Sequence, residues 1–333
     1  MEGGGTRAPP ESPMKLGILF ARGATAGNGS GLGQERRWQR ELSAYRGVFE
    51  EIYEGGDYET LKSCSVLRVT NLTGVWPAIL VEQAYGIPFV LHLGYEHSAV
   101  ARIHGKRWRA FGLQVLRRVA LLQADAVIVH ARHLLSEREW RRFPHCTFIP
   151  NGVDCDLFRP WGGDKFPPPR VVLYVGRQAK EKNLDRLRAA CKGLPPDTRL
   201  AMVGGTTHSV VSERATLWRT VPVEALRGFY WSASVFALPS LTEGCPKAFL
   251  EAMACGVPSV VSDRVRGIGQ PGITHVDCDP LEVKDIRLSI ELALDPDYGR
   301  QIAATALEYV RSHHDINDTL KREVAIVAAC AKR

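Results

Sequence analysis

Residues 240–258 read Ser-Leu-Thr-Glu-Gly-Cys-Pro-Lys-Ala-Phe-Leu-Glu-Ala-Met-Ala-Cys-Gly-Val-Pro and follow the apolar run 235–238. A proline suits the first turn of a helix and a glycine suits the residue after its last turn, so Pro246 and Gly256 predict a helix over about residues 246–255. Its N-terminus would face the carboxyl end of a strand, which is the edge where open α/β sheets bind ligands. The free N–H groups there suit a phosphate or a sugar oxygen.

Two carboxylates belong to this segment, Glu243 before the predicted helix and Glu251 within it. Glu251 lies among apolar residues, and a buried carboxylate needs a partner. Two interpretations of Glu251 stay open: a surface pair with Lys247 one turn earlier, or acceptance of hydrogen bonds from the hydroxyls of a ribose. For Glu243 the simple interpretation is a loop acid that the helix dipole stabilises.

A second cluster has the same organisation. The apolar run 171–175 leads into Gly176-Arg177-Gln-Ala-Lys-Glu-Lys182-Asn183, with Asn183 suited to the N-cap of the next helix. Arg177 and Lys182 flank the predicted turn, so two cations and a helix N-terminus could converge on a diphosphate. The alternative is a solvated charged loop.

Short β-rich runs alternate with segments of helical period along the whole chain, which predicts an α/β protein with parallel sheets. The 333 residues are enough for two domains. We expect a disordered tail over residues 1–13, a first domain over 14–150, a linker rich in Pro and Gly over 151–169 and a second domain over 170–297. Residues 298–333 are predicted to be helical and either to cap the second domain or to cross back to the first.

Composition excludes several classes of protein. Apolar residues make up 45% and charged residues 24%, as in ordinary globular proteins. No apolar run approaches the roughly 20 residues that span a bilayer. The eight cysteines show no CxxC spacing, which favours reduced thiols in the cytoplasm over disulfides or zinc ligands. The motifs of zinc metalloproteases, serine hydrolases and P-loop kinases do not occur.

The first half carries weaker signals. A glycine-rich loop that includes Gly31 and Gly33 follows the first predicted strand without forming GxGxxG, so a dinucleotide fingerprint is not met. His92 and His97 accompany the predicted strand 89–93. Residues 101–118 hold six Lys or Arg and no acid among apolar side chains, a pattern typical of either a solvated helix face or a basic amphipathic helix on an anionic membrane.

Taken together, these segments resemble the retaining glycosyltransferases of family four, the group 1 class with the GT-B fold. The resemblance covers residues 148–263 closely and the first half weakly. Five matches follow one another in the chain: Pro150-Asn-Gly-Val-Asp154, Tyr174-Val-Gly-Arg177 with Glu181-Lys182-Asn183, Met202-Val-Gly-Gly205, Ala237-Leu-Pro-Ser240, and the E-x7-E pair Glu243 and Glu251.

The resemblance implies two Rossmann-like, doubly wound parallel-sheet domains that face each other across a cleft, with a nucleotide-sugar held mainly by the second. By position, Gly176, Arg177 and Lys182 would hold the donor diphosphate, and Glu251 the ribose. Glu243 would contact the donor sugar, aided by the backbone of Gly244, Cys245, Pro246 and Lys247, and residues 221–226 would lie near the base. Members of the family transfer the sugar with retention and usually without a metal or other cofactor.

The first half departs from the family pattern. Many members have a catalytic histidine just after the strand that corresponds to 89–93, where this chain has Gly94, so His92 and His97 are the candidates on either side. Tyr95 and Glu96, together with Gly31 and Gly33, are candidates for the acceptor side. This region looks like a subgroup that makes bacterial surface polysaccharide or lipopolysaccharide.

The function that we expect is therefore hexosyl transfer from a nucleoside-diphosphate-sugar, UDP-sugar first and GDP-sugar second, to a hydroxyl of a glycan or glycolipid. The alternatives are a nucleotide-sugar-binding protein without turnover and another GT-B enzyme, an epimerase or a phosphorylase. The net charge is +7, and residues 14–150 hold 18 basic against 12 acidic side chains. This excess favours contact of residues 101–118 with the inner, anionic face of a membrane over nucleic acid.

Overall fold

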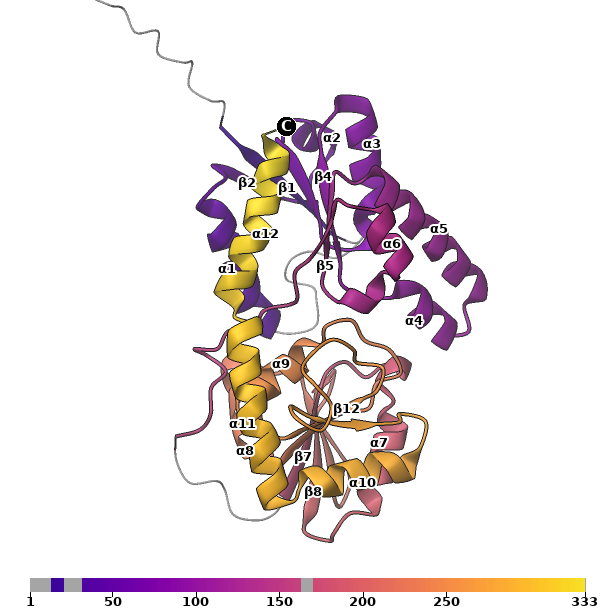
Figure 1. Ribbon diagram of the computed structural model, residues 1–333, viewed down its shortest axis with the longest axis vertical. Coiled ribbons are helices and arrows are strands. Elements are labelled where there is room, and N and C mark those ends of the chain that lie inside the picture. The colour runs from indigo at the N-terminus through magenta and orange to yellow at the C-terminus, as the bar shows by residue number, and fades with distance from the viewer. Residues whose placement is uncertain (1–12, 21–31, 163–169, 333) are drawn as a thin grey trace, which may run out of the picture.

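The computed structural model describes residues 13–20, 32–162 and 170–332 and contains two parallel sheets, one in each half of the chain (Figure 1). The first sheet has the order β2-β1-β3-β4-β5-β6, and every neighbouring pair is parallel. Its strands are β1 (Lys15–Leu19), β2 (Glu51–Glu54), β3 (Val66–Val69), β4 (Phe89–Leu93), β5 (Ala126–Val129) and β6 (Cys146–Phe148).

Helices cover both faces of this sheet. They are α1 (Leu32–Arg46), α2 (Tyr58–Leu61), α3 (Val75–Tyr85), α4 (His97–Ile103), α5 (Arg107–Gln123) and α6 (Glu137–Arg142), with 3-10 turns η1 (Leu72–Gly74) and η2 (Arg132–Leu134). The strand–helix unit between α1 and β3 is short, because β2 and α2 have four residues each.

The second sheet has the order β13-β12-β11-β7-β8-β10-β9, and only the pair β9 and β10 is antiparallel. Its strands are β7 (Arg170–Val175), β8 (Thr198–Gly205), β9 (Ser209–Ser212), β10 (Ala215–Arg219), β11 (Val235–Leu238), β12 (Ser259–Ser262) and β13 (Val276–Cys278). Its helices are η3 (Lys180–Lys182), α7 (Leu184–Lys192), α8 (Val223–Ser232), α9 (Lys247–Ala254), α10 (Val283–Ala293) and α11 (Pro296–His313). The predicted architecture of two doubly wound α/β domains is confirmed.

The last helix, α12 (Ile316–Ala331), returns to the first half of the molecule (Figure 1). It packs with α1 on one face of the first sheet, where Val324, Val327 and Cys330 join the same buried cluster as Leu16 and Ile128. Since this face is apolar on both partners, α12 completes the core of the first domain rather than that of the second.

Turns divide two stretches that were expected to be helical. The basic segment 101–118 was expected to be one helix, but α4 ends at Ile103 and α5 begins at Arg107, because Gly105 takes a left-handed conformation with φ of 73° between them. The stretch after residue 298 likewise divides at His314 and Asp315 into α11 and α12. None of the described helices is long and apolar enough to cross a membrane.

The chain crosses between the two halves twice, and the crossings lie side by side. The N–H of Val153 donates to the carbonyl of His314 at 2.8 Å, and the N–H of Ile316 donates to the carbonyl of Val153 at 3.1 Å. A Cβ on Gly152 would lie 2.6 Å from Cα of Ile316, so only glycine lets the segments approach so closely. Residues 151–158 are thus packed structure, with Leu157 and Phe158 buried, rather than the loose linker that we expected.

Candidate functional site

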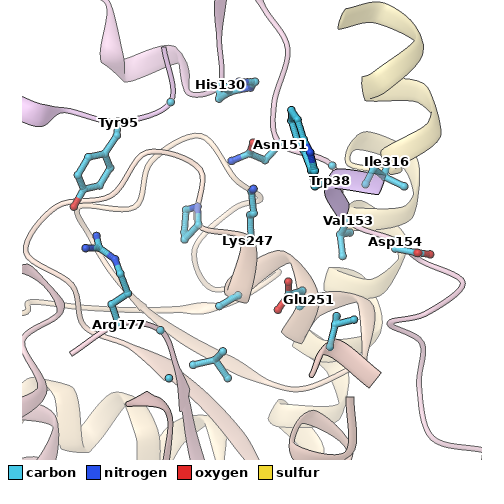
Figure 2. Close-up of a pocket in the computed structure, with 18 of the residues that line it drawn as sticks. Trp38, Tyr95, His130, Asn151, Val153, Asp154, Arg177, Lys247, Glu251 and Ile316 are labelled. Atoms are coloured by element: carbon cyan, nitrogen blue, oxygen red, sulfur yellow. The ribbon is translucent and has the colours of Figure 1, made fainter. Parts of the chain in front are cut away.

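A cleft of about 730 Å³ lies between the carboxyl edges of the two sheets (Figure 2). The first half contributes residues that follow its strands, among them Tyr95 after β4 and His130 after β5. The second half contributes Arg177 after β7 and two residues of α9, Lys247 and Glu251. In parallel α/β sheets the carboxyl ends of the strands are the ordinary place for a ligand, and here two such edges share one cavity.

The turn after β7 brings both predicted phosphate ligands into the cleft. Gly176 has a φ of 154°, and a Cβ there would lie 2.6 Å from the hydroxyl of Tyr174, so a side chain would disturb the turn. Arg177 is 59% exposed in the cleft and its Nη2 lies 3.4 Å from Oε1 of Glu181. Asn183 occupies the N-cap position of α7, but its side chain caps no backbone group and donates instead to the carbonyls of Pro239 and Pro280.

Glu181 was not among the predicted site residues, yet it lies at the centre of this turn. It is buried and accepts a hydrogen bond from Nε2 of His104 at 3.0 Å, from the other half of the molecule. Burial by itself raises the pKa of Glu181, but hydrogen bonds from His104 and the backbone, with the charges of Arg177 and Lys182, hold it below its usual value. An ionised carboxylate therefore lies behind the two cations.

Lys182 and Glu243 form an ion pair in the cleft. The ammonium Nζ lies 2.5 Å from Oε1 of Glu243, and both side chains are largely buried. The backbone next to Glu243 touches the first half, because a Cβ on Gly244 would lie 2.1 Å from the carbonyl oxygen of Gly94. Of the predicted donor-binding residues, Pro246 and Lys247 line the cleft beside Lys182, whereas Gly244 and Cys245 face this contact with the first half.

Helix α9 presents Glu251 to the cleft. The predicted helix is confirmed to within one residue at each end, with Pro246 at the N-cap and Gly256, at φ of 68°, just after it. The hydroxyl of Tyr230, fully buried on α8, donates to Oε2 of Glu251 at 2.8 Å. Burial and the adjacent carboxylate raise the pKa of Tyr230, so the phenol stays a donor. Val221 and Leu226 line the same end of the cleft, as predicted for the neighbourhood of a base.

Hydrogen bonds join the two halves at the rim of the cleft. His133 Nε2 donates to the carbonyl of Glu243 at 3.0 Å, and Asn151 Nδ2 donates to the carbonyl of Cys245 at 2.7 Å. With the bond between His104 and Glu181, they connect the first half to both segments that hold the predicted donor ligands. Sequence reasoning missed this role for all of them, although the Pro-Asn-Gly-Val-Asp match of residues 150–154 marked Asn151.

Of the site residues predicted in the first half, His92, His97 and Tyr95 all line the cleft, with His92 buried and the other two half-buried. His92 is buried and its Nδ1 lies 3.3 Å from Nε2 of His130; burial, with the nearby charge of Arg68, lowers the pKa of His92 well below its usual value. His97 lines the cleft, and its Nδ1 lies 3.1 Å from the carbonyl of Tyr95. The hydroxyl of Tyr95 points toward Arg177 (Figure 2).

Of the other acceptor-side candidates, Glu96 and Gly33 are not among the described residues that line the cleft. Glu96 accepts from the hydroxyl of Ser98 at the start of α4, which turns its carboxylate to its own helix. Gly31 lies outside the described residues, and Gly33 is in the first turn of α1.

The chain is similar in sequence and in fold to known proteins. Residues 169–287 match the family model Glycosyl transferases group 1. The chain is 27% identical to an alpha-maltose-1-phosphate synthase of Mycolicibacterium smegmatis, over 72% of this chain and 71% of that protein. Its structure is similar to that of a sucrose-phosphate synthase from Thermosynechococcus elongatus, with a TM-score of 0.80 at 17% identity, covering 94% of this chain and 98% of the other. It is also similar to Anabaena HepE in complex with UDP-glucose, with a TM-score of 0.73 at 14% identity and coverage of 94% and 98%.

Proposed function

The chain has the GT-B fold and carries a group 1 glycosyltransferase domain over residues 169–287, and from this premise we propose that it transfers a sugar from UDP, with retention of anomeric configuration, to a glycan or glycolipid hydroxyl. One observation carries the proposal: Arg177, Lys182 and the N-terminus of α9 converge on one cleft with Glu251. Cations and helix N–H groups suit a diphosphate, and a carboxylate suits the two hydroxyls of a ribose. The relative that was solved with UDP-glucose supports UDP as the nucleotide.

The geometry supports catalysis by charge. Breaking the bond between the sugar and the diphosphate leaves negative charge on the phosphate, and fixed cations stabilise it most where water is excluded. Arg177 reaches into the cleft from the turn after β7, while Lys182 is held by Glu243. A bound diphosphate would compete with Glu243 for Lys182, which frees the carboxylate of Glu243 to accept from hydroxyls of the donor sugar. No metal is needed in this scheme.

The first test is a thermal-shift screen against UDP-, GDP-, ADP- and TDP-sugars, since a ligand that binds only the folded state raises Tm. We expect the largest shift with a UDP-sugar, then release of UDP when an acceptor is added, with Arg177→Ala and Lys182→Ala losing turnover more than binding. NMR of the product would show a retained anomer. If the protein binds UDP yet consumes no donor with any acceptor in a broad panel, it is a binding protein, and if both variants keep wild-type kinetics, the site is misassigned.

We further propose that α5 holds the enzyme against an anionic membrane. Four apolar side chains with helical spacing, Trp108, Phe111, Val115 and Leu122, are exposed along it, and Trp108 is 88% exposed. Exposed basic residues flank this stripe: Lys106, Arg107, Arg109 and Arg118. Arg117 does not take part, because it binds Glu139 and the carbonyl of Leu134 within the protein. A stripe of exposed aromatic and aliphatic side chains between cations is typical of a helix that lies in the lipid interface.

Cosedimentation with vesicles tests this. Wild-type protein should bind vesicles that contain phosphatidylglycerol and not pure phosphatidylcholine, and Arg107→Glu with Arg109→Glu should weaken binding by at least ~10-fold, since each basic residue contributes about 1 kcal/mol. Val210→Ser, at an exposed site in the second half, is the control that should change nothing. Equal binding by wild type and the double variant would contradict the proposal.

A further inference from the structure

Three buried side chains converge on the first-half side of the cleft without a role in the proposed transfer. They are His92 at the end of β4, His130 just after β5 and Glu323 on α12. One ligand atom from each lies within 4.8 Å of the others. Residues so far apart in the chain meet because β4 and β5 are parallel neighbours and α12 covers their carboxyl ends.

The hydrogen bond from His130 to a backbone carbonyl determines which of its ring nitrogens carries the proton. Its Nδ1 lies 2.9 Å from the carbonyl oxygen of Ile149, and a carbonyl only accepts, so Nδ1 carries the proton. The Nε2 lone pair then faces Nδ1 of His92. An imidazole whose outer N–H donates to a backbone carbonyl is the usual arrangement of a histidine that ligates a metal, because that bond holds the tautomer and the orientation of the ring.

The spacing of the two histidine nitrogens fits a tetrahedral ion. Two imidazole nitrogens at about 2.0–2.1 Å from zinc are about 3.3–3.4 Å apart when the ligand angle is tetrahedral. The distance from His92 Nδ1 to His130 Nε2 is 3.3 Å. Oε2 of Glu323 is 3.9 Å from His92 Nδ1, which a small rotation of the carboxylate would shorten. Two histidines and one glutamate also form a known zinc ligand set that leaves a fourth position open.

The charges around the cluster are compatible with a cation. Arg68 Nη2 lies 3.8 Å from Oε2 of Glu323 and would repel an ion, but it lies closer, at 3.2 Å, to the buried carboxylate of Glu41. Glu41 therefore offsets the guanidinium charge, while Oε2 of Glu323 faces both Arg68 and His92. All of these side chains line the cleft, so an ion could enter from it.

We propose that His92, His130 and Glu323 bind one Zn²⁺ ion, which joins β4, β5 and α12 at the base of the cleft. Imidazole nitrogen with a single carboxylate favours zinc over calcium or magnesium, which prefer oxygen ligands. The proposed zinc site is separate from Arg177 and Lys182, which are proposed to bind the donor. A test of zinc binding is therefore independent of the proposed transfer.

The test is Zn²⁺ binding to full-length protein from which any polyhistidine tag and bound metal have been removed. Competition with a chromophoric chelator should give one Zn²⁺ per chain, a higher Tm, and the visible absorption of tetrahedral Co²⁺ when cobalt replaces zinc. His130→Ala and Glu323→Gln should each weaken binding by more than about 100-fold, because even an outer-shell partner costs 10–100-fold. His313→Ala, an exposed histidine on α11, should bind as wild type does.

Circular dichroism of each variant without metal shows whether it has folded. The two ligand variants change side chains in different parts of the fold, so the test still works if one of them misfolds. The cysteines are the same in all variants and cancel in the comparison. If wild type binds no Zn²⁺ beyond what His130→Ala binds, the cluster is only a hydrogen-bonded histidine pair beside an ion pair, and the proposal is wrong.

Discussion

At the scale of single residues, the pair of Tyr230 and Glu251 offers a graded test of the nucleotide site. Glu251→Ala removes the carboxylate that we expect to accept from the ribose, and Tyr230→Phe removes only the hydroxyl that orients it. A hydrogen bond to a charged group contributes about 1.5–3 kcal/mol, so Glu251→Ala should raise the Kd for UDP by at least ~10-fold and Tyr230→Phe by less. Isothermal titration measures both, and a larger effect of Tyr230→Phe would mean that the tyrosine acts through packing.

The residues differed in how far the sequence predicted them. Arg177, Lys182 and Glu251 were predicted to face one site, and they line the cleft, because each lies in a strand–turn–helix segment whose conformation the local sequence determines. Glu181 and Tyr230 were missed because their partners, His104 and Glu251, lie 77 and 21 residues away. His130 and Glu323 carry no local signal, since only the return of α12 brings them together.

At the scale of elements, α12 should be needed for the stability of the first half. Val327 is fully buried against the first sheet, so Val327→Ala should lower the free energy of unfolding by about 2 kcal/mol through lost contacts and a cavity. Val210→Ala makes the same chemical change on an exposed strand and should cost less than about 0.5 kcal/mol. Urea unfolding followed by circular dichroism compares them, and equal midpoints would show that α12 does not stabilise the first half.

The sequence predicted the central strands and missed the hairpin at one edge of the second sheet. Strands such as β5 and β11 are continuous apolar runs, which is typical of parallel strands covered on both faces. The hairpin of β9 and β10 was not predicted, because β9 is exposed and so has no pattern of buried residues. It forms a strand by pairing with β10. Similarly, the basic residues continue on both sides of Gly105, so their pattern does not reveal the turn that Gly105 makes between α4 and α5.

At the scale of the whole molecule, we expect acid to weaken the contact between the halves. The pKa of Glu181 is held below its ordinary value near 4.5, so this carboxylate adds stability above that pH, and the contribution is lost as pH falls through the lowered pKa. Glu181→Gln should therefore destabilise the protein by roughly 2 kcal/mol at neutral pH, with a difference that shrinks in acid. The measurement is Tm against pH, with Glu308→Gln, an exposed site on α11, as control. A difference from wild type that does not change with pH would contradict this.

The side-by-side crossings at Val153 and Ile316 bring together the two covalent links between the halves. Both covalent links lie on the flank where α11 meets α12, while α4 stands at the opposite flank (Figure 1). Turning one half about this flank would move Gly152 little and would move His104, which follows α4, away from Glu181. A substrate would then enter from the side of α4. Opening on that side would break the hydrogen bond between His104 and Glu181, whose carboxylate lies behind Arg177 and Lys182. The same movement would then admit the donor and free Arg177 and Lys182 from the carboxylate of Glu181 that is held by His104.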